Sequence, residues 1–423
     1  MRTLIALCIL AGIAQAKPIV ITAARLYNGK SDTLEKPGRI IVDGDKIISV
    51  GTASKTPADA DVIDLGDATL MPGLMDAHSH LTFEASEDWK QDELDGFKKT
   101  IPEQTVDATS YARRTLEAGF TSVRDLGSSD LIDIGLRNGI ADGKTPGPRM
   151  KVAVHAIGTR GGHCDPTAGY RPGLLKEPDI TDGVADGPDQ MRAAVRFNVK
   201  HGADVIKVCA SGGVLSLADK VDSPQLTQAE LDAVVDEAHA LGRLAAAHAH
   251  GNEAIVRAVK AGIDSIEHGT FATDQTLALM KKKGTYLVYT PTPCLEERMK
   301  HSGAPANVVE KSKAASNQEQ TMFQHALKAG VTIAFGTDAA VCPHGTQWQS
   351  MANMVKNGMK PLAVLRAATS VDAKLLGVAD KLGVLEAGKL ADVIAVAGDP
   401  STDITKMKDV KLVMKGGVIA VHH

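Results

Sequence analysis

The chain has 423 residues, of which 43% are hydrophobic and 23% are charged, so it can bury a sizeable core and is not wholly disordered. Aromatic residues make up only 3%, and a formal net charge of −4 comes without a long basic block, which argues against a nucleic-acid partner. The length exceeds that of one ordinary domain and suits a barrel of about 250 residues with a smaller companion.

Residues 1–16 are predicted to be a signal peptide. Arg2 supplies a basic start, the apolar run from Leu4 to Ile13 is too short to cross a bilayer, and Ala14-Gln15-Ala16 fits a small-x-small cleavage site. An apolar N-terminal strand is the alternative. Because no later stretch reaches membrane length, we expect an exported protein, periplasmic or secreted, with no membrane partner after cleavage.

Residues 17–70 and 383–423 show strand patterns without long helices. The first segment contains apolar runs at 18–24, 39–43 and 46–50, with Asp43-Gly-Asp45 marking a hairpin turn. The second contains runs at 392–396 and 410–420. Neither segment is large enough for a core of its own, so both ends are predicted to form one discontinuous β-sandwich.

Residues 71–382 alternate short β-rich runs with helical segments, which is typical of βαβ units and a parallel sheet. Strands are predicted to end near His80 and at 121–127, 150–158, 204–210, 244–250, 264–269, 286–290 and 331–337. Helical spacing appears at 105–118, 188–201, 227–241, 253–261, 273–283 and 317–329, and several helices are predicted to end at a glycine: Gly119, Gly202, Gly262 and Gly330. This pattern favours an α/β fold, a (β/α)8 TIM barrel, over an open doubly wound sheet.

Four cysteines follow the signal peptide, namely Cys164, Cys209, Cys294 and Cys342, and none shows CxxC spacing. A chain of this length does not need disulfides, so buried free thiols are the first expectation. A Cys164–Cys342 bridge is the alternative, because both residues fall in loops predicted on the same face of the barrel and export gives an oxidising setting.

The ends of the predicted strands carry a set of metal-ligating side chains. His78 and His80 alternate along one strand, so both imidazoles project from the same side. Lys207 interrupts a buried apolar run and must be neutralised, paired or modified. His248 or His250 alone could be a core histidine, and Asp338 alone could be a helix N-cap. Gathered at one end of a barrel, however, His78, His80, Lys207, His248, His268 and Asp338 predict a site for Zn²⁺ or a similar cation.

These residues lie in motifs that resemble the amidohydrolase superfamily, the metal-dependent (β/α)8 hydrolases. The motifs are Met71-Pro-Gly-Leu-Met-Asp-Ala-His78-Ser-His80, Val205-Ile-Lys207, Ala247-His-Ala-His250, Ile266-Glu-His268-Gly, Phe335-Gly-Thr-Asp338 and Leu385-Glu-Ala-Gly-Lys-Leu-Ala-Asp392. Ala210-Ser-Gly-Gly213 and Thr159-Arg-Gly-Gly-His163 resemble a prolidase-like branch of exported Xaa-Pro and Xaa-Arg/Lys dipeptidases, which includes enzymes that cleave ochratoxin A.

The resemblance implies two divalent ions, with Zn²⁺ expected and Mn²⁺ or Co²⁺ as alternatives. His78, His80 and Asp338 would hold the first ion, and His248 and His268 the second. Lys207, carboxylated by CO₂ to N6-carboxylysine, would bridge the two ions. Asp338 would also be the catalytic base, taking a proton from the attacking hydroxide and passing it to the leaving nitrogen. The family pattern further implies a homo-oligomer.

Further side chains are candidates for contacts with the substrate. His163 lies in a glycine-rich loop, Tyr289 ends a strand, and His250 follows His248 by two residues. An exposed loop histidine and a packed tyrosine are the alternatives. Arg124 either pairs with the adjacent Asp125 or binds a carboxylate, and the pair is favoured.

The sequence therefore predicts a binuclear amidohydrolase that cleaves the amide bond of small dipeptides or N-acyl amino acids. Ochratoxin A is one candidate substrate. A cyclic-amide hydrolase or a deaminase on the same scaffold is the second reading, although Lys207 disfavours the mononuclear deaminase-like groups. A non-catalytic metal-binding scaffold is the third, and the complete set of ligand positions argues against it.

Overall fold

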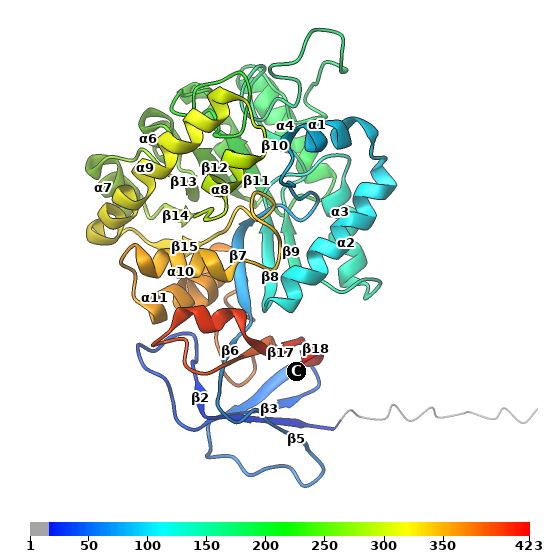
Figure 1. Ribbon diagram of the computed structural model, residues 1–423, viewed down its shortest axis with the longest axis vertical. Helices are drawn as coiled ribbons and strands as arrows, with labels where there is room; N and C mark the ends of the chain where they lie inside the picture. Colours follow the sequence, from blue (N-terminus) through cyan, green and yellow to red (C-terminus); the bar gives the residue numbers. More distant parts are fainter. Residues whose placement is uncertain (1–16) are drawn as a thin grey trace, which may run out of the picture.

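The computed structural model describes residues 17–423 as a larger part of mixed α/β structure and a smaller part made of β-strands (Figure 1). The predicted signal peptide, residues 1–16, lies outside the described residues. Between residues 17 and 423, no helix is both long enough and apolar enough to cross a bilayer.

The strands of the larger part are all parallel to their neighbours, as the alternating pattern predicted. They pair in chain order within two sheets. The first contains β7 (Leu74–Ser79), β8 (Phe120–Asp125) and β9 (Arg149–Val152), and the second contains β10 (Ala156–Ile157), β11 (Val205–Cys209), β12 (Leu244–Ala249), β13 (Ser265–His268), β14 (Tyr286–Tyr289) and β15 (Ile333–Phe335). A parallel bridge between Ser79 and Ala339 links the end of β7 to the segment after β15.

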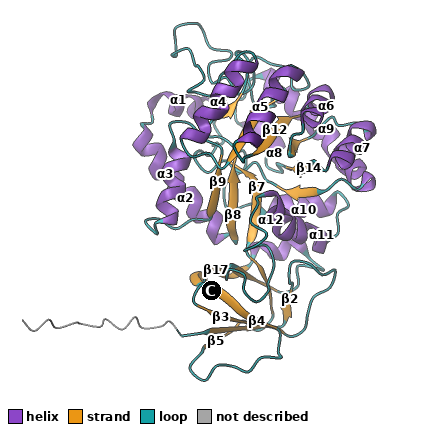
Figure 2. Cartoon of the chain, turned by 180° about the vertical axis from the view of Figure 1, so that it is seen from behind, coloured by secondary structure: helices purple, strands orange, loops and turns teal. Residues whose placement is uncertain are grey.

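Helices surround these strands (Figure 2). They are α1 (Trp89–Lys98), α2 (Ile101–Glu117), α3 (Ile132–Ala141), α4 (Pro188–Lys200), α5 (Gln228–Ala240), α6 (Asn252–Ala261), α7 (Asp274–Lys283), α8 (Leu295–His301), α9 (Ala306–Ala329), α10 (Trp348–Lys356), α11 (Pro361–Arg366) and α12 (Asp372–Leu375). Capping boxes at Thr100 and Thr227 begin α2 and α5. The four glycines predicted at helix ends all adopt positive φ, as a left-handed helix terminus requires.

Helix α9 begins earlier than the sequence pattern predicted. The predicted helix covered residues 317–329, whereas α9 starts at Ala306 directly after Pro305. Val308, Ser312 and Ala315 extend its buried face toward the N-terminus. This extra length places α9 along the cavity described below.

The smaller part joins both ends of the chain, seen as the blue and red segments in Figure 1. One sheet contains β1 (Ile19–Ala23), β3 (Gly38–Asp43), β4 (Lys46–Val50) and β5 (Asp61–Asp64), and the other contains β2 (Arg25–Leu26), β6 (Ala68–Pro72), β16 (Val393–Ala397), β17 (Val410–Lys415) and β18 (Val418–His422). Strand β16 pairs antiparallel with β6, so the C-terminal segment completes a sheet begun near the N-terminus. Ile21, Ile40, Leu70, Val393 and Leu412 belong to their shared core.

The four cysteines form two disulfides, Cys164–Cys209 and Cys294–Cys342. The expectation of free thiols is therefore wrong, and so is the alternative Cys164–Cys342 pair. Strands β10 and β11 are parallel neighbours, so the loop after β10 lies beside the end of β11. The same relation holds for the loops after β14 and β15.

Candidate metal centre

His78 on β7 and His80 directly after it extend toward the carboxylate of Asp338. His78 Nε2 lies 3.3 Å from Asp338 Oδ1, and His80 Nε2 lies 3.4 Å from the same oxygen. The other ring nitrogen of each histidine is already engaged, His78 Nδ1 with Glu267 Oε2 at 2.9 Å and His80 Nδ1 with the Gly127 carbonyl at 3.0 Å. The Nε2 atoms are therefore free to bind a cation.

Asp338 follows β15 in a left-handed backbone conformation, with φ of 54°. Its backbone N–H donates to the His78 carbonyl at 2.8 Å, which fixes this turn against β7. Burial raises the pKa of Asp338, but His78 and His80 outweigh that effect and hold it well below the usual range. A non-glycine residue held at positive φ is costly and is often found at functional sites.

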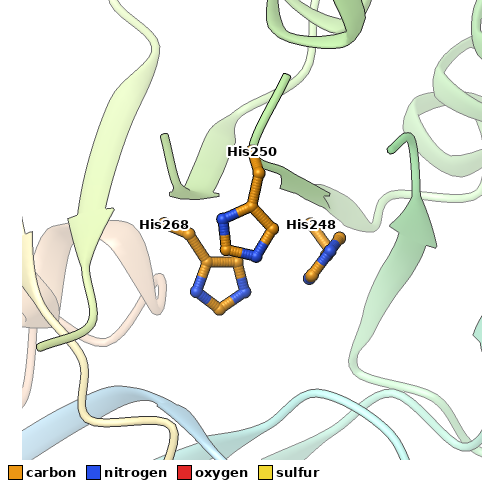
Figure 3. Close-up of side chains that lie close together, drawn as sticks. All are labelled: His248, His250 and His268. Carbon is orange, nitrogen blue, oxygen red and sulfur yellow. The ribbon is translucent and has the colours of Figure 1, made fainter. Parts of the chain in front are cut away.

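A second cluster contains His248 on β12, His250 just after it, and His268 at the end of β13 (Figure 3). One ring nitrogen from each lies within 4.8 Å of the others. His268 also has a positive φ, 69°. The rings of His78 and His268 are 5.0 Å apart between centroids, so the two clusters adjoin.

Neutral acceptors orient the three imidazoles of this second cluster. His248 Nε2 contacts the Gly212 carbonyl at 3.1 Å, His250 Nδ1 contacts Thr270 Oγ1 at 2.7 Å, and His268 Nδ1 contacts Thr290 Oγ1 at 2.6 Å. Burial lowers the pKa of each ring, that of His250 to about 3. The rings are therefore uncharged near neutral pH, and neutral imidazole is the form that binds metal ions.

Lys207 lies between the two clusters on β11. Its Nζ is 3.5 Å from His78 Nε2, and its side chain is buried. Burial lowers the lysine pKa to about 8, although Glu267 and Asp338 act in the opposite direction. Within residues 17–423, no carboxylate lies close enough to form an ion pair with it, and its neutralisation or modification stays a prediction.

These clusters lie in a cavity of about 340 Å³. All the residues predicted for the site line it: His78, His80, His163, Lys207, His248, His250, His268, Tyr289 and Asp338. Much of the remaining wall is apolar, with Phe83, Val214, Leu215, Leu295 and Val341. The arrangement brings histidine nitrogens, a carboxylate and one buried amine into a single space, a donor set that fits a pair of divalent cations.

The side chains predicted to contact the substrate differ in whether their polar atoms already have hydrogen-bond partners. The centroid of the His163 ring is 4.3 Å from that of His248, and within the described part of the chain its buried Nδ1 has no hydrogen-bond partner. Burial lowers the pKa of His163 to about 4. The Tyr289 ring stacks on Phe323, and its hydroxyl accepts from Asn357 Nδ2 at 3.0 Å.

The sequence did not identify two acidic residues near this site, and it assigned Arg124 the wrong partner. Arg124 on β8 pairs with Glu267 on β13 at 2.9 Å rather than with Asp125, although the two strands belong to different sheets. Glu267 stands directly before His268 in its motif, which was the available signal. Glu319 lines the cavity from α9, and nothing in the local sequence marks it.

Comparison with known proteins agrees with this geometry. The amidohydrolase family model matches residues 69–420. Ochratoxinase from Aspergillus niger is 34% identical over 442 residues, covering 97% of this chain and 88% of that protein. Its crystal structure gives 31% identity and a TM-score of 0.82, covering 96% of each chain. A crystal structure of a Xaa-Pro dipeptidase with methionine bound in the active site gives 42% identity and a TM-score of 0.91, covering 96% of this chain and 100% of that one.

Because the family model matches well over half of the sequence, the chain belongs to the amidohydrolase family, and it is a hydrolase.

Proposed function

We propose that this protein is a binuclear metal-dependent amidohydrolase that cleaves the amide bond of dipeptides or N-acyl amino acids. One observation carries the proposal: two clusters of possible metal ligands lie in the same cavity as the buried Lys207. They are His78, His80 and Asp338 in one cluster and His248 and His268 in the other. The similarity to a Xaa-Pro dipeptidase and to an ochratoxinase supports amide substrates, with ochratoxin A among the candidates.

In this proposal His78, His80 and Asp338 would hold one ion, and His248 and His268 would hold the other. The buried neutral amine of Lys207 takes up CO₂ with loss of one proton, and the resulting carbamate would supply anionic oxygen ligands to both ions. Zn²⁺ fits the nitrogen and oxygen donors, and Mn²⁺ or Co²⁺ are the alternatives. Ions bound there would supply Lewis-acid activation of a water molecule and of the substrate's amide carbonyl.

The side chains around these positions complete the catalytic site. Asp338 accepts a proton from the attacking water and delivers it to the leaving nitrogen. His163, with its unpartnered Nδ1, is placed to contact the amide or the substrate carboxylate. His250 packs against His268 with ring centroids 4.6 Å apart, and the Tyr289 ring forms part of the wall. The apolar lining suits an apolar acyl group or side chain.

The finer description of the fold belongs to the same proposal. The parallel bridge between Ser79 and Ala339 supports closure of the parallel strands into a (β/α)8 barrel over residues 71–382. Residues 17–70 and 383–423 then form the companion β-sandwich. Removal of residues 1–16 during export, to the periplasm or the exterior, and assembly into a homo-oligomer complete the proposal.

The test combines metal analysis with hydrolysis of a substrate panel. We expect two divalent ions per chain and hydrolysis of Xaa-Pro dipeptides, Xaa-Met dipeptides or N-acyl amino acids. This hydrolysis should stop when a chelator removes the ions and return when Zn²⁺ is added. The same panel contains hydantoins, whose cleavage would indicate a cyclic-amide hydrolase, and aminated heterocycles, whose conversion would indicate a deaminase. A metal-loaded protein that is inert on every amide overturns the proposal and leaves a metal-binding scaffold.

Substitution of Asp338 tests its assignment as the base. We expect Asp338→Asn to lower kcat by about 10²- to 10⁴-fold, the usual contribution of a general base. Metal content is measured on the same sample, because Asp338 is also a proposed ligand. Full turnover by a variant that still holds both ions contradicts the assignment.

A further inference from the structure

The proposed metal ligands differ in what holds their second ring nitrogen. His80 and His248 contact backbone carbonyls, and His268 contacts a threonine hydroxyl. Among these four histidines, only His78 has a carboxylate at this second nitrogen, because its Nδ1 lies 2.9 Å from Glu267 Oε2. A carboxylate acceptor fixes the tautomer of a ligating histidine and makes the other nitrogen a stronger donor.

Glu267 is itself held rigidly as an anion. Its side chain is fully buried, and its Oε1 accepts from Arg124 Nη2 at 2.9 Å and from Ser265 Oγ at 2.5 Å. Arg124 is anchored in turn, since its Nε donates to the Ala77 carbonyl at 2.6 Å, next to His78. The Arg124 and Glu267 side chains have exposed fractions of only 2% and 0%, so water screens this pair little.

From this geometry we infer that Glu267 is a positioning residue for His78, and that it makes the His78–His80–Asp338 position bind its ion more tightly than the His248–His268 position. The inference rests on the proposed function, because it assumes that both positions take up divalent ions. Its physical basis is charge: a buried anion behind one imidazole favours a cation on the opposite side of that ring.

Two near-isosteric substitutions provide the test. Glu267→Gln keeps an amide oxygen that can still accept from His78 Nδ1, so it removes the charge while retaining the orientation. Thr290→Val removes the hydroxyl that contacts His268 Nδ1 and is the matched control for the second position. Zn²⁺ binding to each chelator-treated protein is measured over a range of buffered free Zn²⁺, and metal per chain is counted by mass spectrometry.

We expect the wild-type protein to bind its two ions in separate steps. In Glu267→Gln, the tighter step weakens by about 10- to 100-fold, the usual effect of losing a partner of a metal-bound histidine. In Thr290→Val, the tighter step is unchanged. Anomalous scattering from crystals at intermediate Zn²⁺ should place the first ion between His78, His80 and Asp338. A first ion at His248 and His268, or a tighter step unchanged in Glu267→Gln, overturns the inference.

A folding control keeps the test decisive. Glu267→Gln leaves the buried Arg124 cation without its counterion, which destabilises the barrel interior. The double variant Arg124→Met/Glu267→Gln removes both charges, and the inference predicts the same weakening of the tighter step in it. No weakening in a folded double variant contradicts the inference. A wild-type chain that binds no divalent ion contradicts the proposed function instead.

Discussion

Glu319 is a half-buried acid in the wall of the cavity, on α9, and it is not needed for the proposed metal positions. Its Oε1 has no hydrogen-bond partner among residues 17–423, and burial raises its pKa to about 7. In the unfolded chain this carboxyl has an ordinary pKa near 4.5. The folded protein therefore holds a proton on Glu319 at pH values where the unfolded chain has lost it.

This difference predicts how Glu319 affects the pH dependence of stability. A pKa raised in the folded state contributes stability below pH 4.5, and that contribution disappears as the pH rises through 7. We expect the wild-type free energy of unfolding to fall by about 2 to 3 kcal/mol more between pH 5 and pH 8 than that of Glu319→Gln, given about 1.4 kcal/mol per pKa unit. Denaturant unfolding at both pH values measures the difference. Parallel profiles for the two proteins contradict it.

Among single residues, the sequence predicted which side chains line the cavity better than it predicted their hydrogen-bond and ion-pair partners. His78, His80, Lys207 and Asp338 could be predicted because strand ends in an alternating α/β pattern share one face. The partner of Arg124 could not, because the choice between Asp125 and Glu267 depends on the side of the strand each one faces. The orientation of the Tyr289 hydroxyl toward Asn357 depends likewise on helix packing that no local pattern encodes.

At the scale of elements, the two disulfides offer a matched comparison. The residues they join are 45 and 48 apart in sequence, so their effects on the entropy of the unfolded chain should be nearly equal. Their surroundings differ. Cys164 directly follows His163, and Cys209 is two residues from Lys207, whereas Cys294–Cys342 joins the loops after β14 and β15.

We therefore expect the two double serine variants to lose similar stability but different activity. Each should lower the free energy of unfolding by about 2 to 4 kcal/mol. Cys164→Ser/Cys209→Ser should also lower kcat/KM more strongly, because the loop that presents His163 is released from β11. Calorimetry and steady-state kinetics on amide substrates measure the two effects. Equal kinetic losses would show that neither disulfide has a special relation to the site.

The cysteine pairing also shows where the sequence-based reasoning reached its limit. The sequence-based interpretation placed Cys164 and Cys342 in loops on one face of the predicted barrel, but one end of a parallel sheet carries many loops. In each disulfide, the first cysteine instead pairs with a residue of the next strand or of its following loop: Cys164 pairs with Cys209 on β11, and Cys294 pairs with Cys342 in the loop after β15. Strand order was predictable, whereas the direction in which each long loop turns was not.

At the scale of the whole molecule, Asp392 connects the smaller part to the larger one. Its side chain is buried and accepts from Arg149 Nη2 of β9 at 3.1 Å and from the Gly416 N–H at 2.8 Å. Its backbone carbonyl accepts from the Gly73 N–H at 2.9 Å, between β6 and β7. The Asp392 carboxylate thus joins a parallel strand to the β17–β18 turn, and the backbone carbonyl of the same residue contacts the segment between the two parts.

The pairing of the chain ends was predictable because residues 17–70 are too few to bury a core alone, and β16 indeed completes their sheet. The junction through Asp392 was not, since it depends on how the two parts sit against each other. We expect Asp392→Asn to lower the free energy of unfolding by about 1 to 3 kcal/mol, as the loss of hydrogen bonds to a buried charge would. The control is Asp67→Asn, which removes an exposed partner of Arg25 and should cost less than about 1 kcal/mol. Thermal unfolding followed by circular dichroism compares them, and equal losses would mean that Asp392 contributes no more than a surface ion pair.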